Sequence, residues 1–208
     1  MNTTEKRIRD AAIKLIARVG YPSMSLRLLA TESGINSSTL YLYYKGKQEL
    51  LTTLVLHHYE QLAADWNRQC PDTCARNTLK AFVAFHLGTH LNNKDEAVLG
   101  NMELRCLDEH ELLTVRQARR RYLGKLQQIL DQGVGEGTWW CDESKLMSRI
   151  IIGLLTQACA WYRNDGQMGI EEVVARYTQM VLNMLEGPGP QLRDCAGRIA
   201  GQARSYGR

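Results

Sequence analysis

Hydroxyl, phenol and ammonium side chains gather in one short stretch, from Ser25 to Lys47. Apolar residues at helical spacing predict a helix over about 25–33, and Gly34 follows where that helix must stop, because glycine adopts positive φ without a Cβ clash. Asn36 is a natural N-cap for a second helix over roughly 37–43. Two short helices joined by a tight glycine turn are typical of a helix-turn-helix, whose second helix enters the major groove of DNA.

The predicted second helix begins with small hydroxyl side chains, which let its backbone approach DNA closely and donate hydrogen bonds to phosphates or base edges. Two tyrosines add phenolic donors with longer reach, and a lysine opens the next helix, where its ammonium and the amide dipole both favour a phosphate. A plain helical hairpin with a polar outer face is the alternative. The candidate DNA contacts are Ser37, Ser38, Thr39, Tyr41, Tyr43 and Lys47.

The positive charge of the chain is concentrated at its N-terminal end. The net charge is +4, and residues 1–50 carry eight lysines and arginines against four acidic residues. The positive and negative charges of the remaining residues therefore cancel. A DNA-binding unit requires such an excess to meet phosphate. After Gly187 the composition shifts to glycine, alanine and arginine, which predicts a basic, flexible tail over 188–208 in which a solvated role is favoured over a contribution to DNA binding.

The elements that must position this stretch are helical throughout. An apolar stripe from Ile8 to Ile16 predicts a first helix that faces the helix-turn-helix, and a long helix from Lys47 to about Cys70 joins it to the rest. Further helices are expected over 75–91, 96–107, 109–133, 143–164 and 170–185. We therefore expect an all-α fold of about nine helices, with a DNA-binding domain at 1–47, a ligand-binding and dimerisation domain at 48–187 and the tail.

The last two predicted helices are apolar over more than one face, so one neighbouring helix layer cannot cover them. The same pair from a second subunit would complete a two-fold four-helix bundle, which predicts a homodimer; a single large monomeric core is the alternative. Two subunits also place two recognition helices about one DNA turn apart, which predicts a near-palindromic operator in double-stranded DNA.

Histidine and cysteine side chains are the candidate metal ligands and catalytic groups of the sequence. Cys70 and Cys74, and likewise His86 and His90, have the spacing of ligands on one helical turn, but they form no four-ligand set and Pro71 disrupts the first pair. The groups lie on predicted helices with no nucleophile and base arranged on a loop. The sequence therefore predicts no metal, no cofactor and no enzyme; an enzyme or a structural adaptor remains the alternative class.

The first ten residues are polar and charged, which does not match a secretory signal. The most apolar run, 150–161, is interrupted and is shorter than the roughly 20 residues that a membrane span needs. Six cysteines without a signal favour reduced thiols. We expect a soluble, cytoplasmic protein with no membrane partner.

The N-terminal region resembles the DNA-binding signature of the TetR family of bacterial regulators. The resemblance covers about Arg7 to Leu51 and is carried by Arg18-Val19-Gly20-Tyr21, Leu29-Ala30, Ser33-Gly34-Ile35, Thr39-Leu40-Tyr41, Tyr43-Tyr44 and Gly46-Lys47-Gln48-Glu49-Leu50-Leu51. It implies a three-helix DNA-binding unit on a helical ligand-binding and dimerising domain. It also implies DNA contacts at Ser25 and Arg27. Departures at Leu28, Asn36, Ser38 and Gly46 leave the bases that the protein reads unpredicted.

A more diffuse resemblance links the later chain, from Glu103-Leu104-Arg105 to Trp161-Tyr162-Arg163, to the TetR branch that responds to acyl-CoA thioesters and fatty acids. It implies an apolar channel for the acyl part, arginines for the phosphates and an aromatic for the adenine. The expected ligand-binding residues are His86, Met102, Glu103, Arg105, Tyr122, Trp161 and Tyr162. The alternative is that these residues bind no ligand: the arginines would form a solvated helix face, and Trp161 and Tyr162 would pack in the core.

Together these patterns predict a ligand-responsive transcriptional regulator, a repressor released from DNA by a small apolar or acyl-CoA-type effector. A repressor that senses multidrug-type cationic or aromatic compounds is the competing interpretation.

Overall fold

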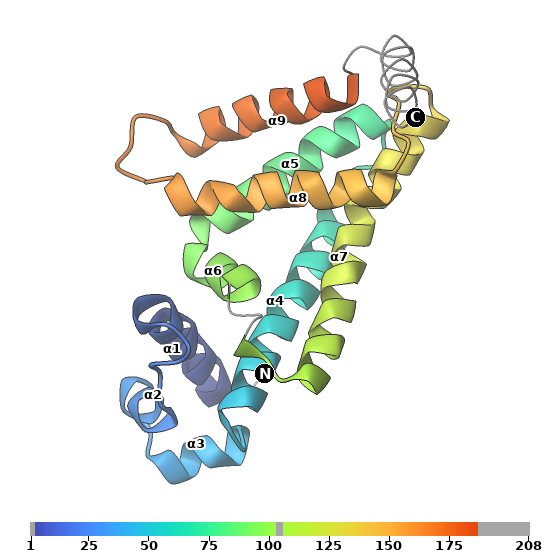
Figure 1. Ribbon diagram of the computed structural model, residues 1–208. Helices are drawn as coiled ribbons and strands as arrows, with labels where there is room; N and C mark the ends of the chain where they lie inside the picture. The colour runs from blue at the N-terminus through green and yellow to red at the C-terminus, as the bar shows by residue number, and fades with distance from the viewer. Residues whose placement is uncertain (1–2, 103–105, 187–208) are drawn as a thin grey trace, which may run out of the picture.

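The computed structural model describes residues 3–102 and 106–186, and every regular element in these ranges is helical (Figure 1). The elements are α1 (Thr3–Val19), α2 (Leu26–Glu32), α3 (Ser37–Tyr43), α4 (Lys47–Gln69), α5 (Ala75–Asn92), α6 (Lys94–Met102), α7 (Glu109–Gly135), α8 (Ser144–Trp161) and α9 (Ile170–Glu186). The predicted all-α class is confirmed. None of the described helices is long and apolar enough to cross a membrane.

The N-terminal helices α1 to α3 pack in sequence, α1 against α2 and α2 against α3. The stripe predicted for α1 is buried, with Ile8 and Ala12 fully inaccessible, and it belongs to the same apolar cluster as Leu29 of α2 and Leu40 of α3. Gly34 has φ +64°, the positive value that the turn between α2 and α3 requires. The expected helix-turn-helix is therefore present.

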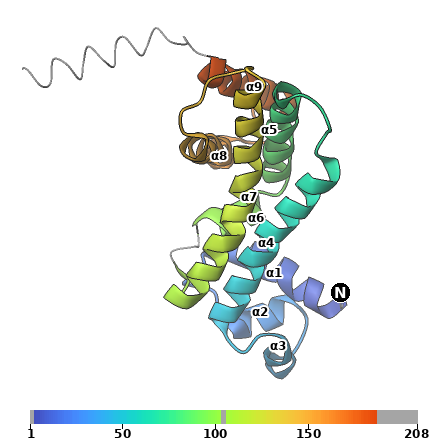
Figure 2. The ribbon, with the colours of Figure 1, turned by 90° about the vertical axis from the view of Figure 1, so that its right-hand side faces the viewer.

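Helix α4 connects this unit to the remaining helices and packs along α7. Helix α5 contacts α7, α8 and α9, so it lies at the centre of the C-terminal layers. Both ribbon views place α1 to α3 at one end of the molecule and α9 at the other (Figures 1 and 2). Helix α6 is the short segment that packs against both α1 and α4, between the two ends.

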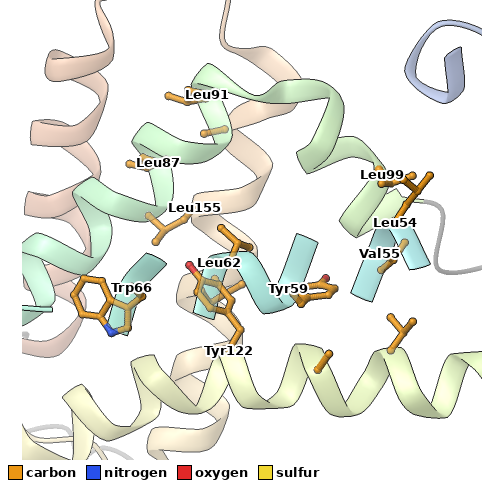
Figure 3. Packing of buried hydrophobic residues seen from close by; sticks show 14 of the residues in the cluster. Leu54, Val55, Tyr59, Leu62, Trp66, Leu87, Leu91, Leu99, Tyr122 and Leu155 are labelled. Carbon is orange, nitrogen blue, oxygen red and sulfur yellow. The ribbon is translucent and has the colours of Figure 1, made fainter. Parts of the chain in front are cut away.

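The main core follows α4. Its buried residues include Leu54, Tyr59, Leu62 and Trp66, and they pack against side chains from α5, α7 and α8. Figure 3 shows Tyr122 reaching from α7 toward Leu62, among side chains from the neighbouring helices. Trp66 meets the ring of Phe82 edge-on, with 4.9 Å between ring centroids.

Several helix ends differ from those expected. Helix α6 begins at Lys94 rather than Glu96, because the backbone N–H of Ala97 already bonds the carbonyl of Asn93. Helix α8 ends at Trp161 rather than Asn164, and Tyr162 adopts extended backbone as its C-cap. The N-cap position of α8 is occupied by Glu143, which forms no side-chain capping hydrogen bond.

Candidate nucleic-acid interface and effector site

The start of α3 is organised by one amide side chain. Asn36 Oδ1 accepts hydrogen bonds from the Thr39 backbone N–H at 2.8 Å and from the hydroxyls of Ser38 and Thr39, each at 2.7 Å. This is the N-cap that the sequence predicted. It also orients two candidate DNA contacts, and their oxygen lone pairs remain available as acceptors. Ser37 and Ser38 are exposed, and Thr39 is half-buried.

The remaining candidate contacts surround this helix. Tyr41 is 55 % exposed, whereas Tyr43 is half-buried against the core. Lys47 Nζ donates to the Pro22 carbonyl at 3.0 Å and lies 4.4 Å from the centroid of the Tyr21 ring, so its ammonium is held beside the α1–α2 turn. The remaining pair, Ser25 and Arg27, flank the start of α2.

Ser25 is the N-cap of α2, with its Oγ accepting from the Leu28 N–H at 3.1 Å. This gives Ser25 a structural role in addition to the phosphate contact expected of it. Arg27 is exposed on the same short helix.

Leu42 is a residue that the sequence reasoning missed. It lies on α3, and its side chain is 84 % exposed, the largest exposed fraction among the large apolar residues that the structure describes. Ser38, Tyr41 and Leu42 stand at i, i+3 and i+4, so they share one face of the helix. The signal was present in the sequence: Leu40 fills the inward position, and an α-helix cannot point Leu42 inward as well.

A small cavity lies between α4, α5, α7 and α8. Its volume is about 10 Å³. Its lining residues are Tyr59, Leu62, His86, His90, Arg119, Tyr122, Leu123, Ile152 and Thr156. The structure thus brings together His86 and Tyr122, two of the residues expected to bind a ligand. It adds His90 and Thr156, which the sequence reasoning did not assign to the site.

Several of the residues that line this cavity form a chain of hydrogen bonds. His86 Nδ1 lies 2.9 Å from Tyr122 Oη, and His86 Nε2 lies 3.1 Å from Thr156 Oγ1. His90 Nδ1 lies 2.9 Å from the carbonyl oxygen of His86, and the two imidazoles stack with centroids 4.0 Å apart. The α5 side of the cavity therefore places two imidazoles beside a lining that also includes the apolar Leu62, Leu123 and Ile152.

His86 and His90, the two histidines of this hydrogen-bonded group, are both neutral. Burial, and then the positive charge that neighbouring histidines would carry, lower the pKa of His86 well below its usual value. The same causes lower the pKa of His90 to about 4. Burial also raises the pKa of the Tyr122 phenol, which stays protonated. The cavity wall at neutral pH therefore offers uncharged hydrogen-bonding groups.

An arginine-rich groove opens beside the cavity, between α7 and α8. Its volume is about 400 Å³. It is lined by Arg116, Arg119, Arg120, Leu123, Arg149 and Ile152. Three of these residues, Arg119, Leu123 and Ile152, also line the inner cavity, so the two spaces share a wall. We call this surface the arginine groove.

The cations of the arginine groove form no ion pair within the part of the chain that the structure describes. These cations are Arg116, Arg119, Arg120 and Arg149. Arg149 comes from α8, and the sequence reasoning did not connect it with the arginines of α7. Four like charges without counter-ions favour an anionic ligand.

A second groove, of about 650 Å³, lies between α4 and α7. Small residues such as Ala63 and Gly124 are among those that line it. Of its cations, Arg121 lies 3.9 Å from Glu60, which partly neutralises it. This groove is therefore a weaker anion site than the arginine groove.

The aromatic pair expected in the pocket lies elsewhere. Trp161 is 45 % exposed, stacks on Tyr177 of α9 and donates its indole N–H to the Tyr177 hydroxyl at 3.1 Å. Tyr162 is buried beneath Lys94, whose ammonium lies 4.9 Å from its ring centroid. Neither residue lines the cavity or the arginine groove.

The other expected ligand-binding residues fall at the gap in the description. Met102 is the last residue of α6, and its side chain lies outside what the structure describes. Glu103 and Arg105 lie outside the described residues.

The sequence matches the family described as "Bacterial regulatory proteins, tetR family" over residues 8–54 and the family "Tetracyclin repressor-like, C-terminal domain" over residues 72–185. It is 24 % identical to the fatty acid metabolism regulator protein of Bacillus subtilis over 161 residues, which covers 76 % of this chain and 83 % of that protein.

Solved structures share the fold. A bacterial regulatory protein of the tetR family from Rhodococcus RHA1 superposes with a TM-score of 0.83 at 24 % identity, covering 89 % of this chain and 98 % of that one. The transcriptional regulator FadR from Bacillus subtilis, solved in complex with stearoyl-CoA, gives a TM-score of 0.75 at 22 % identity, covering 86 % and 97 %. With its helix-turn-helix, its helical second domain and both family matches, this chain belongs to the TetR family of DNA-binding transcriptional regulators.

Proposed function

We propose that this protein is a cytoplasmic, homodimeric repressor whose affinity for its operator falls when it binds an acyl-CoA thioester. The observation that carries the effector proposal is the arginine groove and the wall it shares with the inner cavity. The relative from Bacillus subtilis named as a fatty acid metabolism regulator, and the stearoyl-CoA complex of FadR, support the same ligand class.

The two spaces match the two chemical parts of such a ligand. Coenzyme A carries a pyrophosphate and a further phosphate, and arginine binds phosphate through paired N–H donors. Arg116, Arg120 and Arg149 would hold these phosphates in the groove. The acyl part would then pass Leu123 and Ile152, which line both spaces, toward the cavity at His86 and Tyr122.

On the DNA side, α3 would enter the major groove with Ser37, Ser38, Thr39 and Tyr41, and Leu42 would share that surface. Ser25, Arg27, Tyr43 and Lys47 would contact the backbone around it. Two such helices reach one near-palindromic operator only in a dimer. The three-helix unit within 1–47 would act as the DNA-binding domain and 48–187 as the effector-binding and dimerising domain.

The dimer would form through α8 and α9. Leu146 and Ile150 of α8 are 51 % and 46 % exposed, and Met180 and Met184 of α9 are 50 % and 40 % exposed. Large apolar side chains at this exposure are costly to leave in water, and a four-helix bundle from two subunits would cover them. We infer that this face is the subunit interface.

The coupling between effector and DNA would run through α4 and α6. Tyr59 of α4 lines the cavity, and its hydroxyl donates to the Gly100 carbonyl of α6 at 2.8 Å. Helix α6 packs against α1 of the DNA-binding unit. A ligand that displaces Tyr59 would weaken this support and favour conformations in which the two recognition helices lose their spacing.

Electrophoretic mobility shift with a DNA fragment from upstream of the protein's own gene tests the proposal. Octanoyl-CoA and palmitoyl-CoA should release the DNA, whereas free CoA and free palmitate should release it much less. An Arg116→Gln/Arg120→Gln variant should keep its operator affinity and lose the response to both thioesters. Arg68→Gln removes an exposed cation at the end of α4 and should respond normally. Operator release by either thioester in the double variant as in wild type would contradict a role for the phosphates.

A further inference from the structure

One nitrogen in the cavity lining is an acceptor to which no described residue donates a hydrogen bond. His90 Nδ1 bonds the carbonyl oxygen of His86, and because a carbonyl only accepts, the proton of His90 lies on Nδ1. The ring is neutral, since burial lowers its pKa to about 4, so Nε2 carries a lone pair. No described residue forms a hydrogen bond to that Nε2, although His90 is only 2 % exposed and lines the cavity.

The facing side of the cavity holds a donor without an acceptor. Neutral His86 has one N–H and one lone pair, and it bonds two hydroxyls, those of Tyr122 and Thr156. If the His86 proton lies on Nε2, Thr156 accepts it and the proton of Thr156 is free. If it lies on Nδ1, Tyr122 accepts and its proton is free. In either tautomer one hydroxyl proton lacks an acceptor among the described residues.

The cavity therefore offers one free acceptor and one free donor around a space of about 10 Å³, which is close to the volume that a single water-sized group occupies. A hydroxyl satisfies both partners. A ketone oxygen only accepts and leaves His90 Nε2 unpaired, and a methylene satisfies neither. A carboxylate would bring negative charge against the lone pair of His90.

We propose that the effector is a hydroxyacyl thioester whose hydroxyl donates to His90 Nε2 and accepts from the hydroxyl pair of Tyr122 and Thr156. This rests on the proposed function and narrows its ligand class from acyl-CoA to hydroxylated acyl-CoA. Buried polar groups that lose their partners penalise ligands lacking the matching group, which makes the hydroxyl a determinant of specificity.

Isothermal titration of the full chain with matched thioesters tests this. Butyryl-CoA is compared with 3-hydroxybutyryl-CoA, and octanoyl-CoA with its 3-hydroxy and 8-hydroxy forms. A further ligand, 3-oxo-octanoyl-CoA, carries an oxygen that accepts a hydrogen bond but cannot donate one. At least one hydroxylated thioester should bind about tenfold or more tightly than its parent, because a site built to bond a hydroxyl discriminates strongly against its absence. The 3-oxo thioester, which accepts a hydrogen bond but donates none to His90 Nε2, should bind less tightly than the preferred hydroxylated thioester.

Two substitutions localise the effect. His90→Phe keeps a ring stacked beside His86 and removes the acceptor, so it should abolish the preference for the hydroxyl and leave octanoyl-CoA binding intact or improved. Thr156→Val keeps the shape of the side chain and should reduce the preference. His110→Phe changes an exposed histidine on α7 and should preserve it.

The wild-type comparison decides the matter even if a variant fails to fold. Parent thioesters that bind as tightly as all their hydroxylated forms overturn the inference and leave the proposed function standing. A preference that survives in folded His90→Phe also overturns it. If no thioester binds or releases the operator, the proposed function fails as well.

Discussion

Gly100 of α6 faces the imidazole of His58 so closely that a Cβ at this position would stand 2.5 Å from His58 Cδ2 and 2.7 Å from its Nε2. His58 is buried, and its Nε2 has no hydrogen-bond partner among the described residues. Tyr59, the next residue, bonds the Gly100 carbonyl. The contact between the helix that lines the cavity and the helix that supports α1 therefore depends on a residue without a side chain.

Replacement of Gly100 by alanine should push α6 away from α4, since no flexible side-chain end is available to move. Such overpacking costs about 1–3 kcal/mol of folding free energy. Because α6 packs against α1, we also expect weaker operator binding without any effector. Denaturant unfolding and a mobility-shift titration measure the two effects.

Gly88→Ala is the matched control, because nothing lies within 4 Å of a Cβ on that helical glycine. This substitution should stabilise the protein by up to about 1 kcal/mol. Equal effects from both substitutions would contradict the close contact.

The neutral histidines predict acid sensitivity. The pKa of His90 falls from 6.5 unfolded to about 4 folded, so between these values the unfolded chain binds more protons. Stability is then full above pH 6.5 and is lost as the pH falls toward 4, by about 3 kcal/mol for this residue. His86 shifts in the same direction. Thermal unfolding between pH 7.5 and 4.5 measures the slope, and His90→Phe should make it shallower. A slope unchanged by that substitution would argue against a neutral, buried His90.

Leu42 should contact the 5-methyl group of a thymine, because an exposed apolar side chain on the groove-facing side of α3 has no hydrogen bonds to offer. Replacing that thymine by uracil removes one methyl group and should weaken wild-type binding about fourfold. In Leu42→Ala the same replacement should have no effect. A scan of single uracil substitutions through a selected operator identifies the position. If every uracil substitution costs both proteins equally, Leu42 does not read a methyl group.

Ile150→Asp should separate the subunits, since it places a charge in the apolar face shared by α8 and α9. Analytical ultracentrifugation should then report a monomer, and operator affinity should fall strongly. Leu113→Asp is the control: Leu113 is 53 % exposed on α7, outside that face, and its replacement should leave the dimer intact. A dimeric Ile150→Asp protein would place the interface elsewhere.

The sequence predicted local features well. The turn at Gly34 and the cap at Asn36 depend on residues within four positions of one another, so residue types alone specify them. Helix periodicity likewise located α1 and α4. The exposure of Leu42 also followed from periodicity, but it was overlooked because apolar residues in a helix are expected to pack.

The candidate effector site required information that no local pattern contains. His86 forms hydrogen bonds with Tyr122 and Thr156, which lie 36 and 70 residues away from it in the sequence. Arg149 lies beside the arginines of α7 only because α8 packs on α7. The rotation of each helix about its axis sets such contacts. Trp161 and Tyr162 illustrate the limit: α8 ends between them, so one turns to the surface and the other into the interior beside Lys94.

Helix α4 runs without interruption from Lys47 to Gln69, so it behaves as a rigid lever about 35 Å long. A tilt of about five degrees about its far end would move the residue at its start by about 3 Å, close to the spacing of stacked base pairs. A tilt too small to alter the core noticeably could thus move a recognition helix along the DNA by about one base pair. Under the proposed function, amplification of this kind would let a small cavity control the binding of a dimer to a whole operator.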